Sequence, residues 1–124
     1  MVLYKGGPIE EGLSKVIWAR NVYVKTLGTT LEDEFNYSMR MFVLETNGYI
    51  PLHVHTKAFH LQYLLMGSMR VEIDNEVHDV AQRDVVYIPS KAKHRYINTN
   101  NGRTVFICVT PLFEDDRTDI LERI

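Results

Sequence analysis

The chain has 124 residues, of which 45% are hydrophobic and 24% are charged, and its formal net charge is −2. This length and balance fit one domain with an ordinary hydrophobic core. The slightly negative charge argues against a nucleic-acid partner, which requires clustered lysine and arginine. The single cysteine, Cys108, excludes an internal disulfide, and no apolar stretch approaches the roughly 20 residues that span a membrane. The N-terminus lacks the layout of a signal peptide, so we expect a soluble cytoplasmic protein.

Beyond residue 30 the sequence consists of short apolar runs separated by turn signals, which predicts an all-β sandwich or barrel. Gly67 marks an expected bend, Asp74-Asn75 a tight hairpin and Thr46-Asn47-Gly48 a turn. The run 84–88 is nearly all apolar, as in a strand that is buried on both faces. In chain order, the predicted strands are 22–27, 37–44, 50–55, 60–73 with its bend, 76–80, 84–88, 96–98 and 104–110.

The two ends of the chain differ in sequence pattern from the predicted strands. Residues 10–20 fit either a short helix or an irregular arm. Thr118 is a suitable helix cap, and Ile120, Leu121 and Ile124 follow it, which predicts a short C-terminal helix over 118–124.

Four of the five histidines lie in two short windows, and their spacing suits a metal ion. His53 and His55 stand at i and i+2, so on a strand both imidazoles project from the same face. His60 follows after a gap that is long enough for a turn, and His94 comes much later. Imidazole is the commonest side-chain ligand for first-row transition metals. The fifth, His78, lies in a polar hairpin and is interpreted as a surface residue.

These residues resemble the two motifs of the cupin superfamily, which run Gly…His-x-His…Glu…Gly and Gly…Pro-x-Gly…His…Asn. Gly48 stands one residue closer to the histidine pair than the pattern has it, and His60 replaces the glutamate. Arg83 and Lys91 replace the two glycines of the second motif. The positions that match the pattern are His53, His55, Gly67, Pro89, His94 and Asn98.

The resemblance spans about 37–111 and is strongest to small four-histidine monocupins. It implies a single domain, 1–124, with a double-stranded jelly-roll β-barrel over about 22–111 and an N-terminal arm over 1–21. It also implies that one divalent transition metal per chain is held by His53, His55, His60 and His94. We favour Mn or Fe, with Zn, Ni, Co or Cu as alternatives. Such a ligand shell is neutral, so the full charge of the dication would favour anionic or enolate-type substrates.

Several other residues are candidates for the site. Arg40 could clamp a carboxylate and Gln62 could bind substrate, so both are catalytic candidates; the alternatives are a routine strand charge and a polar residue beside water. Cys108 could also be a small hydrophobe of the core. The cluster of Lys91, Lys93 and Arg95 could be a solvated loop or a rim that attracts an anion. The expected substrate pocket consists of Met39, Met41, Met66, Phe106 and Cys108, with Tyr63 also lining or filling the barrel.

The sequence contains no nucleophile elbow and no phosphate-binding glycine loop. We therefore expect a metalloenzyme that acts on a small organic molecule, an anion among the candidates, by dioxygenase-type oxidation or by metal-assisted isomerase, cyclase or lyase chemistry. The alternatives are a small-molecule binding or sensing module and, more weakly, a structural barrel with a vestigial site. The resemblance implies a homodimer, for which Val22-Tyr23-Val24 is the expected contact.

Overall fold

The computed structural model describes residues 7–30 and 36–124, and the part of the chain that it describes is all β-structure. No helix in that part is long and apolar enough to cross a membrane. The first six residues of the expected N-terminal arm lie outside the described ranges. The strands are β1 (Ser14–Lys15), β2 (Arg20–Thr30), β3 (Tyr37–His55), β4 (His60–Met66), β5 (Ser68–Ile73), β6 (Glu76–Ala81), β7 (Val85–Ile88), β8 (His94–Asn98), β9 (Thr104–Pro111) and β10 (Thr118–Ile120).

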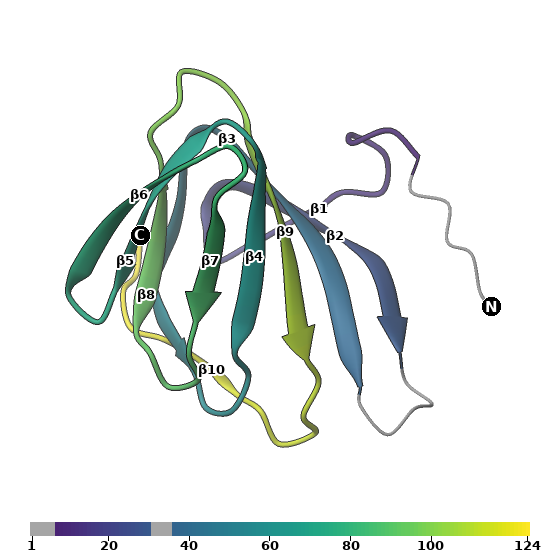
Figure 1. Cartoon of the computed structure of the whole chain (residues 1–124), viewed down its shortest axis with the longest axis vertical. Coiled ribbons are helices and arrows are strands. Elements are labelled where there is room, and N and C mark those ends of the chain that lie inside the picture. The colour runs from purple at the N-terminus through teal and green to yellow at the C-terminus, as the bar shows by residue number, and fades with distance from the viewer. Residues whose placement is uncertain (1–6, 31–35) are drawn as a thin grey trace.

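The strands pair in the order β6-β5-β8-β3-β9-β4-β7, while β2 and β10 also pair with β3, and β1 pairs with β2. All of these pairs are antiparallel. The first part of β3 lies between β2 and β9, and its last part pairs with β8 and β10. The sheet therefore curves into a nearly closed barrel (Figure 1), which confirms the predicted jelly-roll class.

β3 is one bent strand, and the prediction of two strands separated by a turn is wrong. The pairing with β2 shifts register between Leu44 and Tyr49. At the bend Asn47 has a φ of 64°. A Cβ on Gly48 would lie 2.8 Å from the Glu45 carbonyl oxygen and 2.9 Å from the Leu44 Cβ, so only glycine fits there. The turn signal at these positions thus marks a bulge that redirects a continuous strand.

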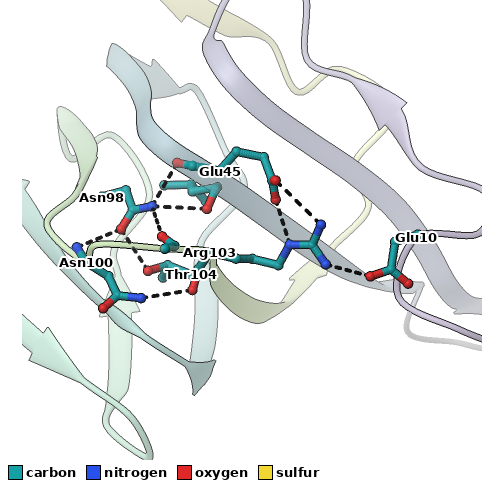
Figure 2. Close-up of polar contacts among 8 residues, drawn as sticks. Glu10, Glu45, Asn98, Asn100, Arg103 and Thr104 are labelled. Atoms are coloured by element: carbon teal, nitrogen blue, oxygen red, sulfur yellow. Dashed lines mark hydrogen bonds and ion pairs between the residues drawn. The ribbon is translucent and has the colours of Figure 1, made fainter.

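Asn98 holds this bend against the turn between β8 and β9. Its Nδ2 donates to the carbonyl oxygens of Leu44 (3.1 Å), Glu45 (2.8 Å) and Gly102 (2.9 Å), and its Oδ1 accepts from Thr104 Oγ1 at 2.9 Å. Figure 2 shows these contacts converging on the Asn98 amide. A single buried side chain thus satisfies the backbone groups that the bulge leaves without ladder partners.

Arg103 fastens the N-terminal segment to the same region. Its Nε donates to Glu45 Oε1 at 2.6 Å, and one terminal nitrogen donates to Glu10 Oε1 at 2.7 Å (Figure 2). In the described residues this segment contains turns and the short β1, so it is an irregular arm and not a helix. It covers the outer face of the barrel, where Ile9 and Leu13 pack against Met41, Val43 and Val105.

The main core fills the barrel interior. Alternation along residues 37–44 predicts that Arg40, Phe42 and Leu44 share one face of the strand and that Met41 and Val43 share the other. The structure confirms this, because Phe42 and Leu44 belong to this core while Met41 and Val43 pack under the arm. The buried members are Ala19, Val22, Leu44, Ile50, Leu64, Met69, Val71, Val80, Val86, Ile88, Ala92, Tyr96, Phe106 and Cys108.

Two turn predictions are confirmed and one burial prediction is wrong. Gly67 separates β4 from β5 with a φ of 88°, and Asp74 and Asn75 connect β5 to β6 with φ values of 46° and 72°. Two consecutive positive φ angles are typical of a tight hairpin turn. The run 84–88 is not buried on both faces, because Val85 and Tyr87 of β7 are 64% and 56% exposed. β7 is the last strand of the order, and its outer face is left open.

The predicted C-terminal helix is wrong. Thr118–Ile120 forms β10, which pairs with His55, Val54 and His53 of β3, and residues 121–124 have no regular secondary structure. Glu122 then accepts hydrogen bonds from Tyr49 Oη and from the Leu52 backbone N–H, which ties the end of the chain to the barrel. Pairing with an available strand edge outweighs the weak helix propensity of this short segment. In Figure 1 the yellow C-terminal segment passes beneath the barrel.

The expected dimer contact through residues 22–24 does not rest on a free strand edge. Tyr23 and Val24 pair with β1 on one side and with β3 on the other, and Val22 is buried in the core. These residues therefore offer no open strand edge to a second copy. Dimerisation itself stays a prediction.

We expect Gly67→Ala to lower the free energy of unfolding by about 2–5 kcal/mol, since it combines a strained backbone with overpacking. The new Cβ would lie 2.5 Å from Thr104 Oγ1 and 2.9 Å from the Arg103 carbonyl oxygen. Chemical denaturation of the full chain measures the change. Gly12→Ala is the matched control, because Gly12 also has a positive φ but a Cβ there meets nothing within 4 Å. Equal losses in the two variants would contradict the close approach at Gly67.

Candidate metal centre

The four motif histidines come from three strands of the barrel. His53 and His55 lie at the end of β3, His60 begins β4 and His94 begins β8. His53 lies directly opposite His94 in the pairing of β3 with β8. His53, His60 and His94 are buried, and His55 is half-buried. The bend in β3 therefore brings residues that are distant in the sequence to one place in the wall.

Three of these histidines form a compact group. His53, His55 and His94 each offer a ring nitrogen, and these three atoms lie within 4.8 Å of one another. Bonds of about 2.1 Å to a shared ion would suit this spacing after small side-chain rotations. His60 stands beside the group, with its ring centroid 4.5 Å from that of His55 and 6.0 Å from that of His94. Of the four predicted metal ligands, three thus form a compact group, and His60 lies next to that group.

Hydrogen bonds at Nδ1 fix the orientation of the rings. His53 Nδ1 lies 2.7 Å from the Pro51 carbonyl oxygen, and His94 Nδ1 lies 2.9 Å from that of Ala92. A carbonyl only accepts, so both Nδ1 atoms carry the proton and both Nε2 atoms carry a free lone pair. Metal-binding histidines characteristically use their second nitrogen in this way.

The other two rings contact side chains. His55 Nδ1 lies 2.8 Å from Thr118 Oγ1 of β10, and His60 Nδ1 lies 3.3 Å from Cys108 Sγ. His60 Nε2 is buried and has no hydrogen-bond partner among the described residues. An unpartnered buried nitrogen of this kind is uncommon in proteins and fits a ligand position. The donor set present therefore suits a transition metal ion.

Burial keeps these imidazoles neutral. It lowers the pKa of His94 to about 4, of His53 to about 3 and of His60 to about 2, and it also lowers the pKa of His55. The charge of neighbouring histidines lowers the pKa of His53 and His60 further, while backbone hydrogen bonds to His53 and His94 act in the opposite direction. The neutral form is the form that binds a metal.

The C-terminal segment organises the loop between His55 and His60. Asp116 Oδ1 accepts from the backbone N–H of Lys57 at 2.7 Å and of Ala58 at 2.9 Å. The Arg117 N–H donates to Thr56 Oγ1, and the Thr56 N–H donates to the Arg117 carbonyl oxygen. Sequence reasoning misses Asp116, which lies in a polar run and suggests a solvated residue, and Thr118, whose pattern predicts a helix cap. No local signal could reveal them, because both act on residues about sixty positions away.

The histidines line a cavity of about 370 Å³ inside the barrel. Arg40 of β3, Cys108 of β9 and Gln62 of β4 form a row across three paired strands, and all three residues line this cavity. Gln62 Nε2 donates to Tyr96 Oη at 2.7 Å. A second cavity of about 240 Å³ shares His55, His60 and Arg40 with the first. The structure thus brings Arg40 and Gln62, the two catalytic candidates, beside the histidines.

Only two of the five expected pocket residues, Phe106 and Cys108, line the main cavity. Met41 packs under the N-terminal arm, while Met39 and Met66 are exposed at the outer surface. Tyr63 is also exposed. The reason is strand alternation: because Arg40 and Phe42 face inward, their odd-numbered neighbours on β3 face outward.

Cys108 combines its two expected roles. It is buried in the core and also contacts His60 in the cavity wall. Burial raises the pKa of its thiol, which is therefore neutral at pH 7 and acts as a weak partner to the imidazole.

The charged residues around His94 do not line the main cavity. Arg95 pairs with Glu72 at 3.1 Å and with Glu122 at 3.3 Å, and Lys91 and Lys93 are exposed. This arrangement supports a solvated loop at Lys91 and Lys93 more than a substrate-attracting rim. His78 is exposed and pairs with Glu76, as expected for a surface residue.

Comparisons with known proteins agree with this architecture. An uncharacterized protein of Methanocaldococcus jannaschii is 33% identical over 72 residues, which are 57% of this chain and 58% of that protein. The chain thus matches little more than half the length of this curated relative.

Among solved structures, the polyketide cyclase RemF from Streptomyces resistomycificus has a TM-score of 0.74 and 20% identity, covering 86% of this chain and 75% of that chain. A cupin 2 domain-containing protein from Halorhodospira halophila has a TM-score of 0.72 and 25% identity, covering 90% of this chain and 76% of that chain. The family model described as a cupin domain matches residues 40–110, which include His53, His55, His60 and His94. The chain therefore belongs to the cupin domain family.

Proposed function

We propose that this protein is a metal-dependent enzyme that acts on a small organic anion inside the barrel. One observation carries the proposal: His53, His55 and His94 converge, neutral and largely buried, in the wall of a mostly apolar cavity that Arg40 and Gln62 also line. A metal centre with convergent polar groups in an apolar cavity is a typical enzyme site. The reaction we favour is a redox-neutral isomerisation, cyclisation or elimination, with dioxygenase-type oxidation as the second candidate.

The cofactor we propose is one divalent transition metal per chain, with His60 as the fourth ligand. His60 Nε2 has no partner among the described residues, and a metal ion would provide one. We favour Mn or Fe, while Zn, Ni, Co and Cu also accept imidazole ligands. When bound, the ion supplies Lewis-acid polarisation of a carbonyl or enolate oxygen.

The neutral ligands are the reason for placing redox-neutral chemistry first. Imidazoles leave the charge of a dication uncompensated, which favours an anionic ligand and disfavours higher oxidation states. Arg40 would bind the anionic group of the substrate, and Gln62 would orient a neighbouring oxygen. A polyketide cyclase shares this fold, which supports the view that the fold accommodates such reactions.

A non-catalytic binding or sensing module is the alternative. No aspartate or glutamate of the described chain lines the main cavity, so a carboxylate base for proton abstraction is missing there. An enzyme of this kind would have to use an imidazole or a metal-bound group in its place. Turnover separates the two functions.

The decisive experiment is anaerobic metal loading followed by an activity assay. Full-length protein purified without a histidine tag is stripped with a chelator and loaded separately with Mn, Fe, Co, Ni, Cu and Zn. We expect one metal ion per chain by elemental analysis and oxygen-independent conversion of enolic or phenolic acids. Conversion that requires oxygen would favour the dioxygenase-type reaction instead. No conversion of enolic, phenolic or oxalate-like substrates at full metal occupancy would refute the enzyme and favour the binding module.

His60→Gln tests the fourth ligand. We expect metal affinity, measured by competition with a chelating dye, to fall clearly but not to vanish, because the three converging histidines are retained. His78→Gln is the matched control, since His78 lies on the exposed face of β6. Unchanged affinity in His60→Gln would remove His60 from the ligand set.

Thr118 should matter because it orients His55. We expect Thr118→Val to lower metal affinity about 10- to 100-fold, as is typical when the hydrogen bond behind a ligating histidine is lost. Thr118→Ser keeps the hydroxyl and should retain most of the affinity. Thr99→Val, at the exposed turn after β8, is the control for replacing a threonine. If Thr118→Val and Thr99→Val bind metal equally well, Thr118 does not position His55.

The metal-free protein should become less stable as the pH falls from about 6.5 to about 4. Unfolded histidines bind protons near pH 6.5, whereas the folded pKa is about 4 for His94 and about 3 for His53. The unfolded state binds more protons between these values, so the free energy of unfolding decreases as the pH falls. Urea denaturation across this range measures the slope. We expect a shallower slope in His94→Gln and an unchanged one in His78→Gln; the opposite order would contradict a buried neutral cluster.

A further inference from the structure

The cavity contains a row of nearly parallel aromatic rings. The Phe42 and Phe106 centroids lie 5.0 Å apart with an interplanar angle of 14°, and the Phe106 and Tyr96 centroids lie 5.3 Å apart at 24°. All three residues line the cavity. Trp18, on the segment between β1 and β2, also lines it and meets His53 edge-on at 4.9 Å. Because these rings stack on one another, they offer the cavity mainly their edges, and edge-to-face contacts with a ligand ring add to simple apolar burial.

Two polar atoms beside this row have no partner among the residues that the structure describes. Gln62 is only 3% exposed. Its Nε2 donates to Tyr96 Oη, and its Oε1 has no hydrogen-bond partner. Arg40 Nε is buried and unpaired as well. Buried polar groups are nearly always satisfied, so this pair indicates a ligand that completes them.

The two atoms require opposite partners. Arg40 Nε is a donor and needs an acceptor, ideally an anionic oxygen, since guanidinium–carboxylate bonds are the stronger kind. Gln62 Oε1 is an acceptor and needs a hydroxyl donor. The residues occupy the same row of the sheet with Cys108 between them, so one ligand can reach both.

The position of Arg40 connects the polar pair to the aromatic row. Its guanidinium carbon lies 5.0 Å from the centroid of the Phe42 ring, so the charge sits at the end of the row. A ligand ring lying against the edges of Phe42 and Phe106 would direct an acidic substituent toward Arg40. The cavity volume of about 370 Å³ is near the lower limit for ligand pockets, which suits one ring or two fused rings.

We propose that the cavity selects a planar cyclic hydroxy acid: an aromatic or enolic ring that carries an acidic group and a hydroxyl. This inference rests on the proposed function, because it names the substrate class of the same site. Arg40 binds the acid, Gln62 accepts from the hydroxyl, and Phe42 with Phe106 holds the ring. Val16, Val24 and Ile50 add apolar surface to the wall, where the hydroxyls of a polyhydroxylated sugar acid would find no partner.

The single tryptophan of the chain gives a direct readout. Trp18 is the only indole, so its Nε1–H is one resonance in a nitrogen–proton correlation spectrum. Full-length protein, both metal-free and loaded with diamagnetic Zn²⁺, is titrated with 3-hydroxybenzoate, benzoate, phenol and cyclohexanecarboxylate. We expect 3-hydroxybenzoate to bind most tightly in both forms. Benzoate lacks the hydroxyl, phenol lacks the acid and cyclohexanecarboxylate lacks the flat ring, so each should bind more weakly.

Variants assign the contacts. We expect Arg40→Gln to weaken binding of 3-hydroxybenzoate about 10- to 100-fold, as for a lost hydrogen bond to a charged group, and to leave phenol binding nearly unchanged. Arg40→Lys keeps the positive charge but lacks the Nε donor. Its affinity for 3-hydroxybenzoate should therefore lie between that of the unchanged protein and that of Arg40→Gln. Arg70→Gln is the control, since Arg70 lies on β5, is exposed and pairs with Asp79. Thermal unfolding of each variant shows whether it folds. If Arg40→Gln does not fold, the affinity of Arg40→Lys for 3-hydroxybenzoate tests the contact instead.

The outcomes separate this inference from the proposed function. Equal binding of benzoate and cyclohexanecarboxylate, or no response of Trp18 in a protein that binds metal, would overturn the ring-selective site and leave the metal centre standing. If the metal-free protein binds 3-hydroxybenzoate selectively but the protein fails to bind metal or to turn over substrate, the ring-selective site stands and the proposed enzyme function is refuted.

Discussion

The geometry of the centre depends on the bend in β3. This strand leaves one half of the barrel, where it pairs with β2 and β9, and enters the other half, where it meets β8 and β10. Gly48 permits the close approach at the bend, and Asn98 satisfies the carbonyls that the bend exposes. The part of β3 after the bend pairs with β8 and sets His53 opposite His94, while the part before the bend carries Arg40 and pairs with β9. Asn98, which matches the family motif, therefore has a backbone role in this chain, and it does not line the main cavity.

Burial and hydrogen bonding then act together on the histidines. Burial removes the charged forms, and the contacts to Pro51 and Ala92 select the tautomer that leaves Nε2 free. The C-terminal segment adds the third constraint, because Thr118 fixes His55 and Asp116 fixes the loop that leads to His60. Neutral imidazoles inside a barrel gain nothing from ion pairing, so their stability comes from these hydrogen bonds and the apolar core around them.

The sequence was most informative where a periodicity or a fixed spacing carried the signal. Alternation along β3 predicted that Arg40 and Phe42 share a face, and the motif spacing brought His53, His55 and His94 together. Alternation defines two faces without saying which one is inward, and the methionines were therefore placed on the wrong side. Only the tertiary structure could decide this, because an N-terminal arm covers Met41 and makes its outward face apolar too.

Contacts between distant segments lay outside the reach of sequence reasoning for a different reason. The segment at Thr118 has a helix-like pattern, yet a free edge of β3 offers it backbone hydrogen bonds that an isolated short helix lacks. The same pairing brings the Thr118 hydroxyl to His55. Trp18 reaches His53 because the turn before β2 folds over the cavity. Each of these contacts follows from topology, and none leaves a trace in local composition.

The charges around the cavity favour an anionic ligand, as the proposed function requires. Burial raises the pKa of Tyr96 and of Cys108, so neither supplies a negative charge at pH 7. Arg40 is positive, the histidines are neutral, and no carboxylate of the described residues lines the main cavity. Adding a dication would make this region strongly positive in a poorly polarisable setting, where an uncompensated charge is costly. An anionic ligand would remove that cost, and the ion and Arg40 would attract the same oxygen-rich end of the molecule. The neutral histidines and the half-buried Arg40 thus act in the same direction, since each leaves the compensating negative charge to the substrate.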